Sequence, residues 1–203
     1  MHYIIITHPV PVINESEIIN NILDHNYATV HIRKPDYTID ELRNFLNTIS
    51  VGNHSKIVIH NHFELIQEFS LKGIHFTRHN KHLITNSYPA YIFKSISTHS
   101  LNEINDLPNL FDYYFLSPIF KSTSKPGYGG DAFHLNDVKS YIEKHPLKKL
   151  VALSGVTQNT IKDAKNTGFY GAAILGDFWN FCNKNKNLDL IPLFFQQLNH
   201  AIQ

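Results

Sequence analysis

The chain has 203 residues, 42% of them hydrophobic, which is enough for one sizeable core. Its 18 basic and 17 acidic residues leave a net charge of +1, which excludes binding to nucleic acid or a membrane through overall charge. The single cysteine, Cys182, excludes an internal disulfide framework and predicts a reducing compartment, the cytoplasm. No signal peptide is expected at the start, and no apolar run approaches the roughly 18 residues of a membrane-spanning helix.

Short runs of apolar and β-branched residues predict strands that are buried on both faces. In chain order the runs are YIIIT (3–7), ATVHI (28–32), KIVIH (56–60), GIHF (73–76), AYIFKSI (90–96), DYYFL (112–116), KLVAL (149–153) and YGAAIL (170–175). Each run is flanked by polar or turn residues.

Helical periodicity separates many of these runs, at residues 15–25, 38–49, 135–145, 157–168 and 190–202. Thr38 and Glu41 have the spacing of a capping box, and Gly168 is placed to end a helix. After the fourth run the pattern is weak and predicts only a short helix.

The alternation of eight strands with helices predicts parallel βαβ units, and the number eight indicates an α/β fold, a single (β/α)₈ TIM barrel. A doubly wound open sheet is the alternative. Because no linker, repeat or low-complexity tract interrupts the chain, residues 1–203 are expected to form one domain. In such a barrel the functional site lies at the carboxyl ends of the strands.

The residues at those ends are small, polar and suited to anions. They are Arg33, Asn61 with His62, Thr77 with Arg78, Ser97, Ser117 with Pro118, Ser154 with Gly155, and Gly176 with Asp177. A guanidinium holds phosphate with two hydrogen bonds, although an arginine here also suits a surface salt bridge. His31 points the same way as Arg33 and is expected inside the barrel or at its rim.

Two loops have the composition of phosphate-binding segments. After the sixth strand, Ser122, Ser124 and Lys125 offer two hydroxyls and a positive charge, and the glycines that follow suit a lid. After the seventh strand, Ser154 and Gly155 lead towards a helix whose N-terminus suits a second phosphate. The alternatives are an ordinary exposed loop and a simple strand-to-helix turn.

The chain has 14 histidines, and His31, His60, His62, His75 and His99 fall near strand ends. A metal centre needs three or four ligands that converge on one point, and a sequence does not show convergence. Proton transfer by a histidine is therefore favoured, and no metal site is assigned.

Six segments in this order resemble the thiamine phosphate synthase and TenI-like thiazole tautomerase family. They are HIRKP (31–35), VIHNHFELIQEFSLKGIHF (58–76), SISTHSLNEI (95–104), DYYFLSPIFKSTSK (112–125), ALSGVTQNT (152–160) and GFYGAAILGDFW (168–179). The resemblance covers roughly residues 3–180. It implies a (β/α)₈ barrel that is often a homodimer, with small phosphorylated substrates.

The resemblance implies a synthase that joins hydroxymethylpyrimidine diphosphate to a thiazole phosphate and releases pyrophosphate. Stabilisation of the departing anion would then dominate catalysis. By position, the pyrimidine diphosphate would contact Arg33, Asn61, Ser97 and Lys125. The thiazole end would contact Ser122 and Ser124, and its phosphate the backbone of Ser154, Gly155 and Gly176. Arg33, Lys125 and His62 are the expected catalytic residues.

The chain departs from the family at its metal and lysine positions. The family holds Mg²⁺ with two aspartates, and His62 and Asn80 occupy their places here. The lysine expected two residues after Arg33 is shifted to Lys34.

The tautomerase branch needs no such metal, but its histidine after the sixth strand is missing here, so His62, His31 or His99 would substitute. A tautomerase and a catalytically silent paralogue that binds thiazole or thiamine phosphate are therefore the alternatives to the synthase.

Overall fold

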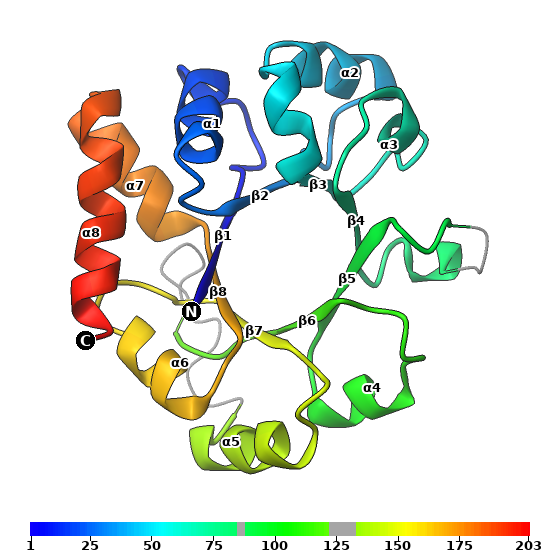
Figure 1. Ribbon diagram of the computed structural model, residues 1–203, viewed down its shortest axis with the longest axis vertical. Coiled ribbons are helices and arrows are strands. Elements are labelled where there is room, and N and C mark those ends of the chain that lie inside the picture. The colour runs from blue at the N-terminus through cyan, green and yellow to red at the C-terminus, as the bar shows by residue number, and fades with distance from the viewer. Residues whose placement is uncertain (85–87, 122–132) are drawn as a thin grey trace.

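The computed structural model describes residues 1–84, 88–121 and 133–203. Parallel strands β1 to β8 close into a barrel in sequence order, which confirms the predicted TIM barrel and excludes the open sheet (Figure 1). The strands are β1 His2–Ile6, β2 Thr29–Ile32, β3 Ile57–Ile59, β4 Gly73–Phe76, β5 Phe93–Thr98, β6 Tyr113–Leu116, β7 Leu150–Leu153 and β8 Gly171–Ile174.

The helices form a ring outside the strands (Figure 1). The α-helices are α1 Glu15–Asp24, α2 Ile39–Asn47, α3 Leu65–Glu68, α4 Leu101–Asp106, α5 Leu135–Lys144, α6 Ile161–Thr167, α7 Gly176–Asn185 and α8 Ile191–Ala201. Short 3₁₀ helices are η1 Val51–Lys56, η2 Lys81–Leu83 and η3 Leu188–Leu190. The short helix expected after β4 is therefore η2. No helix within the described residues is long and apolar enough to cross a membrane.

Local signals in the sequence place several helix ends correctly. The capping box of α2 is complete, because the Thr38 hydroxyl accepts from the Glu41 backbone and the Glu41 side chain accepts from the Thr38 backbone. Gly168 ends α6 with a φ of 96°. The start of α6 differs from the prediction: Thr157 and Thr160 form a hydrogen-bonded turn, so the helix begins at Ile161.

The fifth strand also differs from its predicted bounds of 90–96. A turn closed by the hydrogen bond from Ile92 N to Pro89 O precedes it, and the strand then extends to Thr98. Its last residues pair with β6, Ser97 opposite Phe115 and Thr98 opposite Leu116. Ser97 therefore lies within the strand and not after it.

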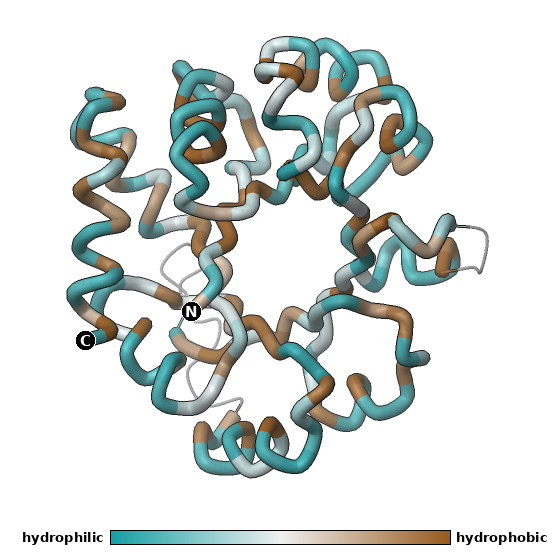
Figure 2. The backbone as a smooth tube through the Cα atoms, viewed as in Figure 1, coloured by the Kyte–Doolittle hydropathy of each residue, from teal (hydrophilic) through white to brown (hydrophobic). Residues whose placement is uncertain are grey.

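Apolar residues pack on both faces of the barrel wall. The larger core lies between the strands and the helices, and hydrophobic residues follow the strands in Figure 2. A smaller cluster fills part of the interior with Ile4, Ile6, Tyr113, Phe115, Val151 and Ala173. These residues come from β1, β6, β7 and β8, so the opposite half of the interior is free for polar side chains.

A buried ion pair joins the first residue of α1 to the segment after β2. Lys34 Nζ lies 2.7 Å from Glu15 Oε2, and it donates to the carbonyl oxygens of His8 at 2.8 Å and Val10 at 3.2 Å. Burial lowers the pKa of Lys34 and raises the pKa of Glu15, while the direct contact opposes both shifts. Lys34, which stands one residue before the lysine position of the family, therefore stabilises the barrel wall and does not face a substrate.

Candidate active site at the carboxyl ends of the strands

The interior of the barrel is polar on the side formed by β2 to β5. Alternation along the strands turns His31, His75 and Ser95 inward, because β-strand side chains alternate between faces. His60 follows β3 directly and joins them. The structure thus brings together histidines from three neighbouring strands.

Hydrogen bonds connect these histidines to each other and to hydroxyl groups. His31 Nδ1 lies 3.0 Å from His60 Nε2, and His31 Nε2 contacts the Tyr113 hydroxyl. The two nitrogens of His75 lie 2.8 Å from the hydroxyls of Ser95 and Ser97. Ser97, predicted at the rim, is therefore engaged by the cluster.

The three imidazoles are neutral at physiological pH. Desolvation lowers the pKa of His75 to about 3, with a smaller contribution from the positive charge of Arg33. Burial also lowers the pKa of His31 and His60 well below the usual value of histidine. In the same environment burial raises the pKa of Tyr113 well above its ordinary value, so its hydroxyl stays protonated.

Arg33 stands above this cluster at the end of β2. Its backbone N–H donates to the Thr7 hydroxyl at 2.8 Å, and that hydroxyl donates to the Arg33 carbonyl at 3.3 Å. The half-buried guanidinium makes no hydrogen bond or ion pair with any of the described residues. It is therefore available for an anionic group in the barrel mouth.

Unsatisfied buried atoms concentrate at the carboxyl ends of the strands. Within the described part of the chain, the buried side-chain atoms without a hydrogen-bond partner are Asn21 Oδ1, His60 Nδ1, Asn61 Oδ1 and Asp177 Oδ2. Three of these belong to the ends of β3 and β8. Native structures leave few such atoms, so each of these groups is expected to meet water or a ligand.

The positions that the family resemblance assigns to magnesium do not fit that ion. His62 Nε2 lies 2.7 Å from the Tyr37 carbonyl, and a nitrogen ligand is unsuited to Mg²⁺. Asn80 Oδ1 accepts from Thr77 N at 2.6 Å, and Asn80 Nδ2 donates to the His60 carbonyl at 2.9 Å. Both side chains brace loops, and neither supplies the charged oxygen ligands that Mg²⁺ prefers.

The loop after β7 is closely packed against the segment after β6. Gly155 has a φ of +63°, and a Cβ at this position would lie 2.3 Å from the Lys121 carbonyl oxygen. The Ser154 hydroxyl donates to Phe120 O at 3.2 Å, and Thr160 donates to Gly155 O at 2.8 Å. This packing keeps the backbone of the loop in place.

The segment after β8 begins a helix directly, since α7 starts at Gly176. Asp177 occupies its first turn, and burial raises the pKa of this carboxyl group, while a hydrogen bond from the Gln158 backbone opposes the rise. Gly176 is thus at a helix N-terminus as a phosphate-binding role requires, but a carboxylate neighbours it.

The remaining predicted residues lie elsewhere. Ser122, Ser124 and Lys125 lie outside the described residues, so their predicted contacts stay predictions. His99 Nδ1 lies 3.0 Å from the Ser117 carbonyl, which holds its ring at the end of β5. His60, His75, Ser95 and Tyr113 were not predicted as site residues. Their inward positions follow from strand alternation, but their convergence has no signal in the sequence.

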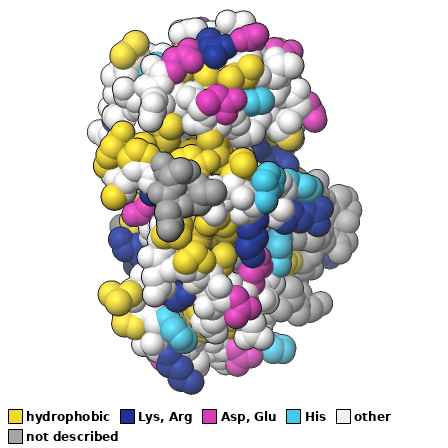
Figure 3. Space-filling model, turned by 90° about the vertical axis from the view of Figure 1, so that its right-hand side faces the viewer, with side chains coloured by type: hydrophobic (Ala, Val, Ile, Leu, Met, Phe, Trp, Pro, Cys, Tyr) yellow, Lys and Arg dark blue, Asp and Glu magenta, His cyan; other side chains and the backbone are white. Residues whose placement is uncertain are grey.

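Arginine, lysine and histidine side chains gather outside the mouth, on the segment after β4. Exposed side chains there are Arg78, His79, Lys81 and His82. Figure 3 shows the face of the molecule on this side, where lysine, arginine and histidine side chains gather beside a hydrophobic area. Lys81 pairs with Glu103 at 3.4 Å, so the positive charge of this surface is partly balanced.

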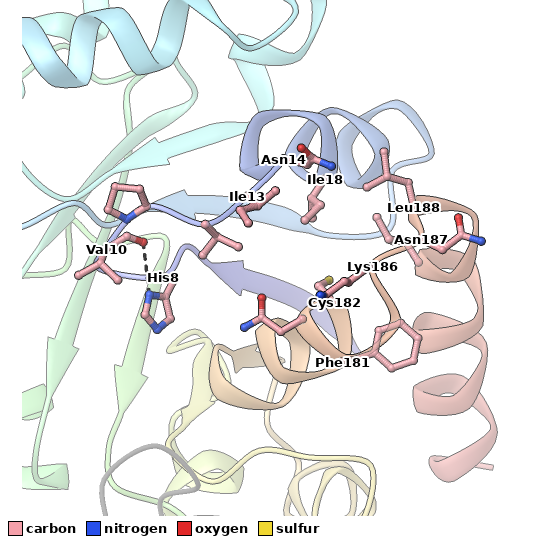
Figure 4. Close-up of a pocket in the computed structure, with 14 residues that line it drawn as sticks. His8, Val10, Ile13, Asn14, Ile18, Phe181, Cys182, Lys186, Asn187 and Leu188 are labelled. Carbon is pink, nitrogen blue, oxygen red and sulfur yellow. Dashed lines mark hydrogen bonds between the residues drawn. The ribbon is translucent and has the colours of Figure 1, made fainter.

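A second hollow, of about 510 Å³, lies between the β1–α1 loop and α7 (Figure 4). Its lining is largely apolar and includes Val10, Ile13, Phe181 and Leu188. Cys182 also lines it, and burial raises the pKa of this thiol to about 12, so it is not a nucleophile at neutral pH. Lys186 is the one lysine or arginine in its described lining, so the hollow offers less positive charge than a diphosphate needs.

Comparison with known proteins identifies the protein family that this chain matches. A family model described as thiamine monophosphate synthase matches residues 3–178. Thiamine phosphate pyrophosphorylase from Bacteroides thetaiotaomicron is 27% identical, with a TM-score of 0.81 over 99% of this chain and 97% of that chain. A search of curated proteins found no match.

More distant solved structures share the fold. Thiamine phosphate pyrophosphorylase from Pyrococcus furiosus is 14% identical, with a TM-score of 0.68 over 99% of this chain and 95% of that chain. A 3-hexulose-6-phosphate synthase is 12% identical, with a TM-score of 0.57 over 100% of both chains. At these identities the similarity concerns the barrel and not the reaction.

Proposed function

Because the chain belongs to the thiamine monophosphate synthase family, we propose that it joins hydroxymethylpyrimidine diphosphate to a thiazole phosphate and releases pyrophosphate. The observation that supports this reaction most directly is the match along nearly the whole chain to a protein named thiamine phosphate pyrophosphorylase. Of the predicted synthase residues, Arg33 and Asn61 follow the neighbouring strands β2 and β3, and Ser97 lies near the carboxyl end of β5, beyond β4.

In this proposal Arg33 binds the diphosphate. Departure of pyrophosphate creates negative charge on the leaving oxygen, and a guanidinium placed there stabilises it without reorganisation. The unpartnered Asn61 Oδ1 accepts a hydrogen bond from the amino group of the pyrimidine. Lys125 is proposed as the second cation on the departing anion. No step is assigned to Mg²⁺, because His62 and Asn80 do not suit it.

The thiazole phosphate is proposed to bind across the barrel, at the loops after β7 and β8. The backbone N–H groups of Gly155 and Gly176 are the donors in this arrangement. Asp177 lies beside them, and a charged carboxylate there repels phosphate. Burial raises the pKa of Asp177, so this repulsion weakens as the pH falls through that raised pKa.

The test is a coupling assay with the purified full chain, both substrates and detection of thiamine phosphate. We expect product both with Mg²⁺ and after its removal by a chelator, because no step is assigned to that ion. The matched variants are Arg33→Gln, which removes the proposed diphosphate ligand, and Arg43→Gln, which removes a guanidinium on the outer helix α2. Loss of product in the first variant alone supports the proposal. Absence of product from the unmodified chain under every metal condition contradicts it.

Isomerisation of a thiazole carboxylate phosphate is the second candidate, and the buried histidine cluster favours it. Neutral imidazoles beside the mouth are able to accept and return a proton, which is the step that this reaction needs. If the coupling assay gives no product, NMR is used to follow the thiazole carboxylate phosphate. Its conversion to the other tautomer then supports this candidate. Binding of the thiazole phosphate without either reaction indicates a silent paralogue.

A further inference from the structure

The three buried histidines of the barrel interior have the arrangement of a metal site. His31, His60 and His75 each offer one ring nitrogen, and these nitrogens lie within 4.8 Å of one another. His31 and His75 are fully buried, and His60 is 8% exposed. They come from β2, from the end of β3 and from β4, so three neighbouring strands hold them in place.

We propose that His31, His60 and His75 bind one transition-metal dication of the class of Zn²⁺, Co²⁺ or Ni²⁺. Imidazole suits these ions, whereas Mg²⁺ and Ca²⁺ prefer oxygen ligands. The site is separate from the magnesium positions that the family resemblance assigns to His62 and Asn80. It also does not depend on which reaction the chain performs.

The distance between two of the nitrogens is close to that of a three-histidine centre, and the third nitrogen lies within 4.8 Å of both. Two zinc–nitrogen bonds of about 2.0–2.1 Å at a tetrahedral angle place the nitrogens about 3.3 Å apart. His31 Nδ1 and His60 Nε2 lie 3.0 Å apart, so a small outward movement of the rings admits the ion. Three protein ligands leave a fourth position open, as in catalytic zinc sites.

One buried nitrogen of the cluster lacks any partner. His60 Nδ1 makes no hydrogen bond to the described residues, although the side chain is more than nine-tenths buried. Because His60 Nε2 is the nitrogen that faces His31, the unpartnered Nδ1 is the outer nitrogen of the ring, and it needs a separate partner such as water.

Partners of the other ring nitrogens hold the imidazoles in orientation. The Tyr113 hydroxyl contacts His31 Nε2, and this leaves His31 Nδ1 to face His60. His75 has a serine hydroxyl at each nitrogen, so it exchanges one serine for the ion and keeps the other. Such outer partners set the tautomer and direction of metal-binding histidines.

The protonation state of the histidines favours binding of a metal ion, whereas the nearby positive charges oppose it. Burial favours the neutral imidazole, which is the form that binds a metal ion, but the proton between His31 Nδ1 and His60 Nε2 has to leave that position. Arg33 and Lys72 lie close enough to oppose an added positive charge. No described carboxylate hydrogen-bonds to the cluster, and the charge is therefore balanced by an anion or hydroxide at the open position.

The experiment is a titration of metal-stripped full-length protein with Co²⁺, followed by visible absorption. We expect one ion per chain with the strong bands of four-coordinate cobalt, and displacement of these bands by Zn²⁺. His60→Gln should weaken binding by at least about 100-fold, and Tyr113→Phe, through loss of the orienting hydroxyl, by roughly 10- to 100-fold. His82→Gln, an exposed histidine outside the cluster, should bind as the unmodified chain does.

Circular dichroism establishes that each variant is folded before titration. If His60→Gln does not fold, Tyr113→Phe decides, because it retains the ring that packs against Phe115 and Phe93. The proposal is overturned if the unmodified chain shows no stoichiometric cobalt bands. It is also overturned if folded His60→Gln, or in its absence Tyr113→Phe, binds Co²⁺ as tightly as the unmodified chain.

Discussion

At the scale of single residues, the position of a cation determines what it does. Arg33 and Lys34 are adjacent in the sequence, yet the Lys34 ammonium is buried against Glu15 while the Arg33 guanidinium has no partner among the described residues. Strand alternation sends neighbouring side chains to opposite faces, which explains this division. Only Arg33 is therefore expected to affect anion binding directly.

We expect Arg33→Gln to weaken pyrophosphate binding by about 10-fold or more, because a hydrogen bond to a charged group contributes about 1.5–3 kcal/mol. Isothermal titration calorimetry measures this change. Arg43→Gln is the matched control, since Arg43 pairs with Asp40 and Glu68 outside the barrel. Equal affinities for the Arg33 variant and the unmodified chain would remove Arg33 from the site.

At the scale of structural elements, close backbone approach constrains the loop after β7. Gly155 combines a positive φ with contact to the Lys121 carbonyl, so the loop tolerates no side chain there. The sequence motif Ser-Gly suggests a turn, but it does not show that another segment packs against the glycine. The extension of β5 to Thr98 likewise depends on a neighbouring segment, because pairing with β6 determines where the strand ends.

We expect Gly155→Ala to lower the free energy of unfolding by at least about 1–3 kcal/mol, from the strained φ and the overlap with Lys121. Gly52→Ala is the control, because a Cβ at Gly52 meets nothing within 4 Å. Urea denaturation of both variants measures the difference. A Gly155 variant as stable as the Gly52 variant would show that the loop relaxes without cost.

At the scale of the whole molecule, a buried ion pair and a set of exposed ion pairs are expected to contribute differently to the free energy of unfolding. The Lys34–Glu15 pair joins the first βα unit to β2 with side chains that are 0% and 4% exposed. Arg43 pairs with Asp40 and Glu68 at the surface, where solvent screens the attraction. Removal of one buried partner leaves an uncompensated charge in the barrel wall.

We expect Lys34→Met to destabilise the protein by about 3–5 kcal/mol, and Glu15→Gln to do so by a similar amount. The double variant should lose less than the sum of the two, since it leaves no unpaired charge. Arg43→Gln should change stability by no more than about 1 kcal/mol. Thermal unfolding of the four variants and the unmodified chain measures these effects, and additive losses would show that the pair is not coupled.

The sequence by itself determined the order of strands and helices, the parallel barrel and the family. These features follow from local patterns: apolar runs, helical periodicity, and caps such as Thr38 and Gly168. The inward direction of His31 and His75 also follows from alternation along a strand. Arg33, Asn61 and Ser97 were predicted at the strand ends, and their contacts with substrate stay predictions.

Only the tertiary structure decided which of these side chains meet. His31, His60 and His75 are separated by 29 and 15 residues (60 − 31 and 75 − 60), and closure of the barrel places their nitrogens within 4.8 Å. The unpartnered His60 Nδ1 and the burial of Lys34 are likewise consequences of packing. The physical reason is that strand tilt, register and the surrounding helices set distances across the barrel, and no local pattern encodes them.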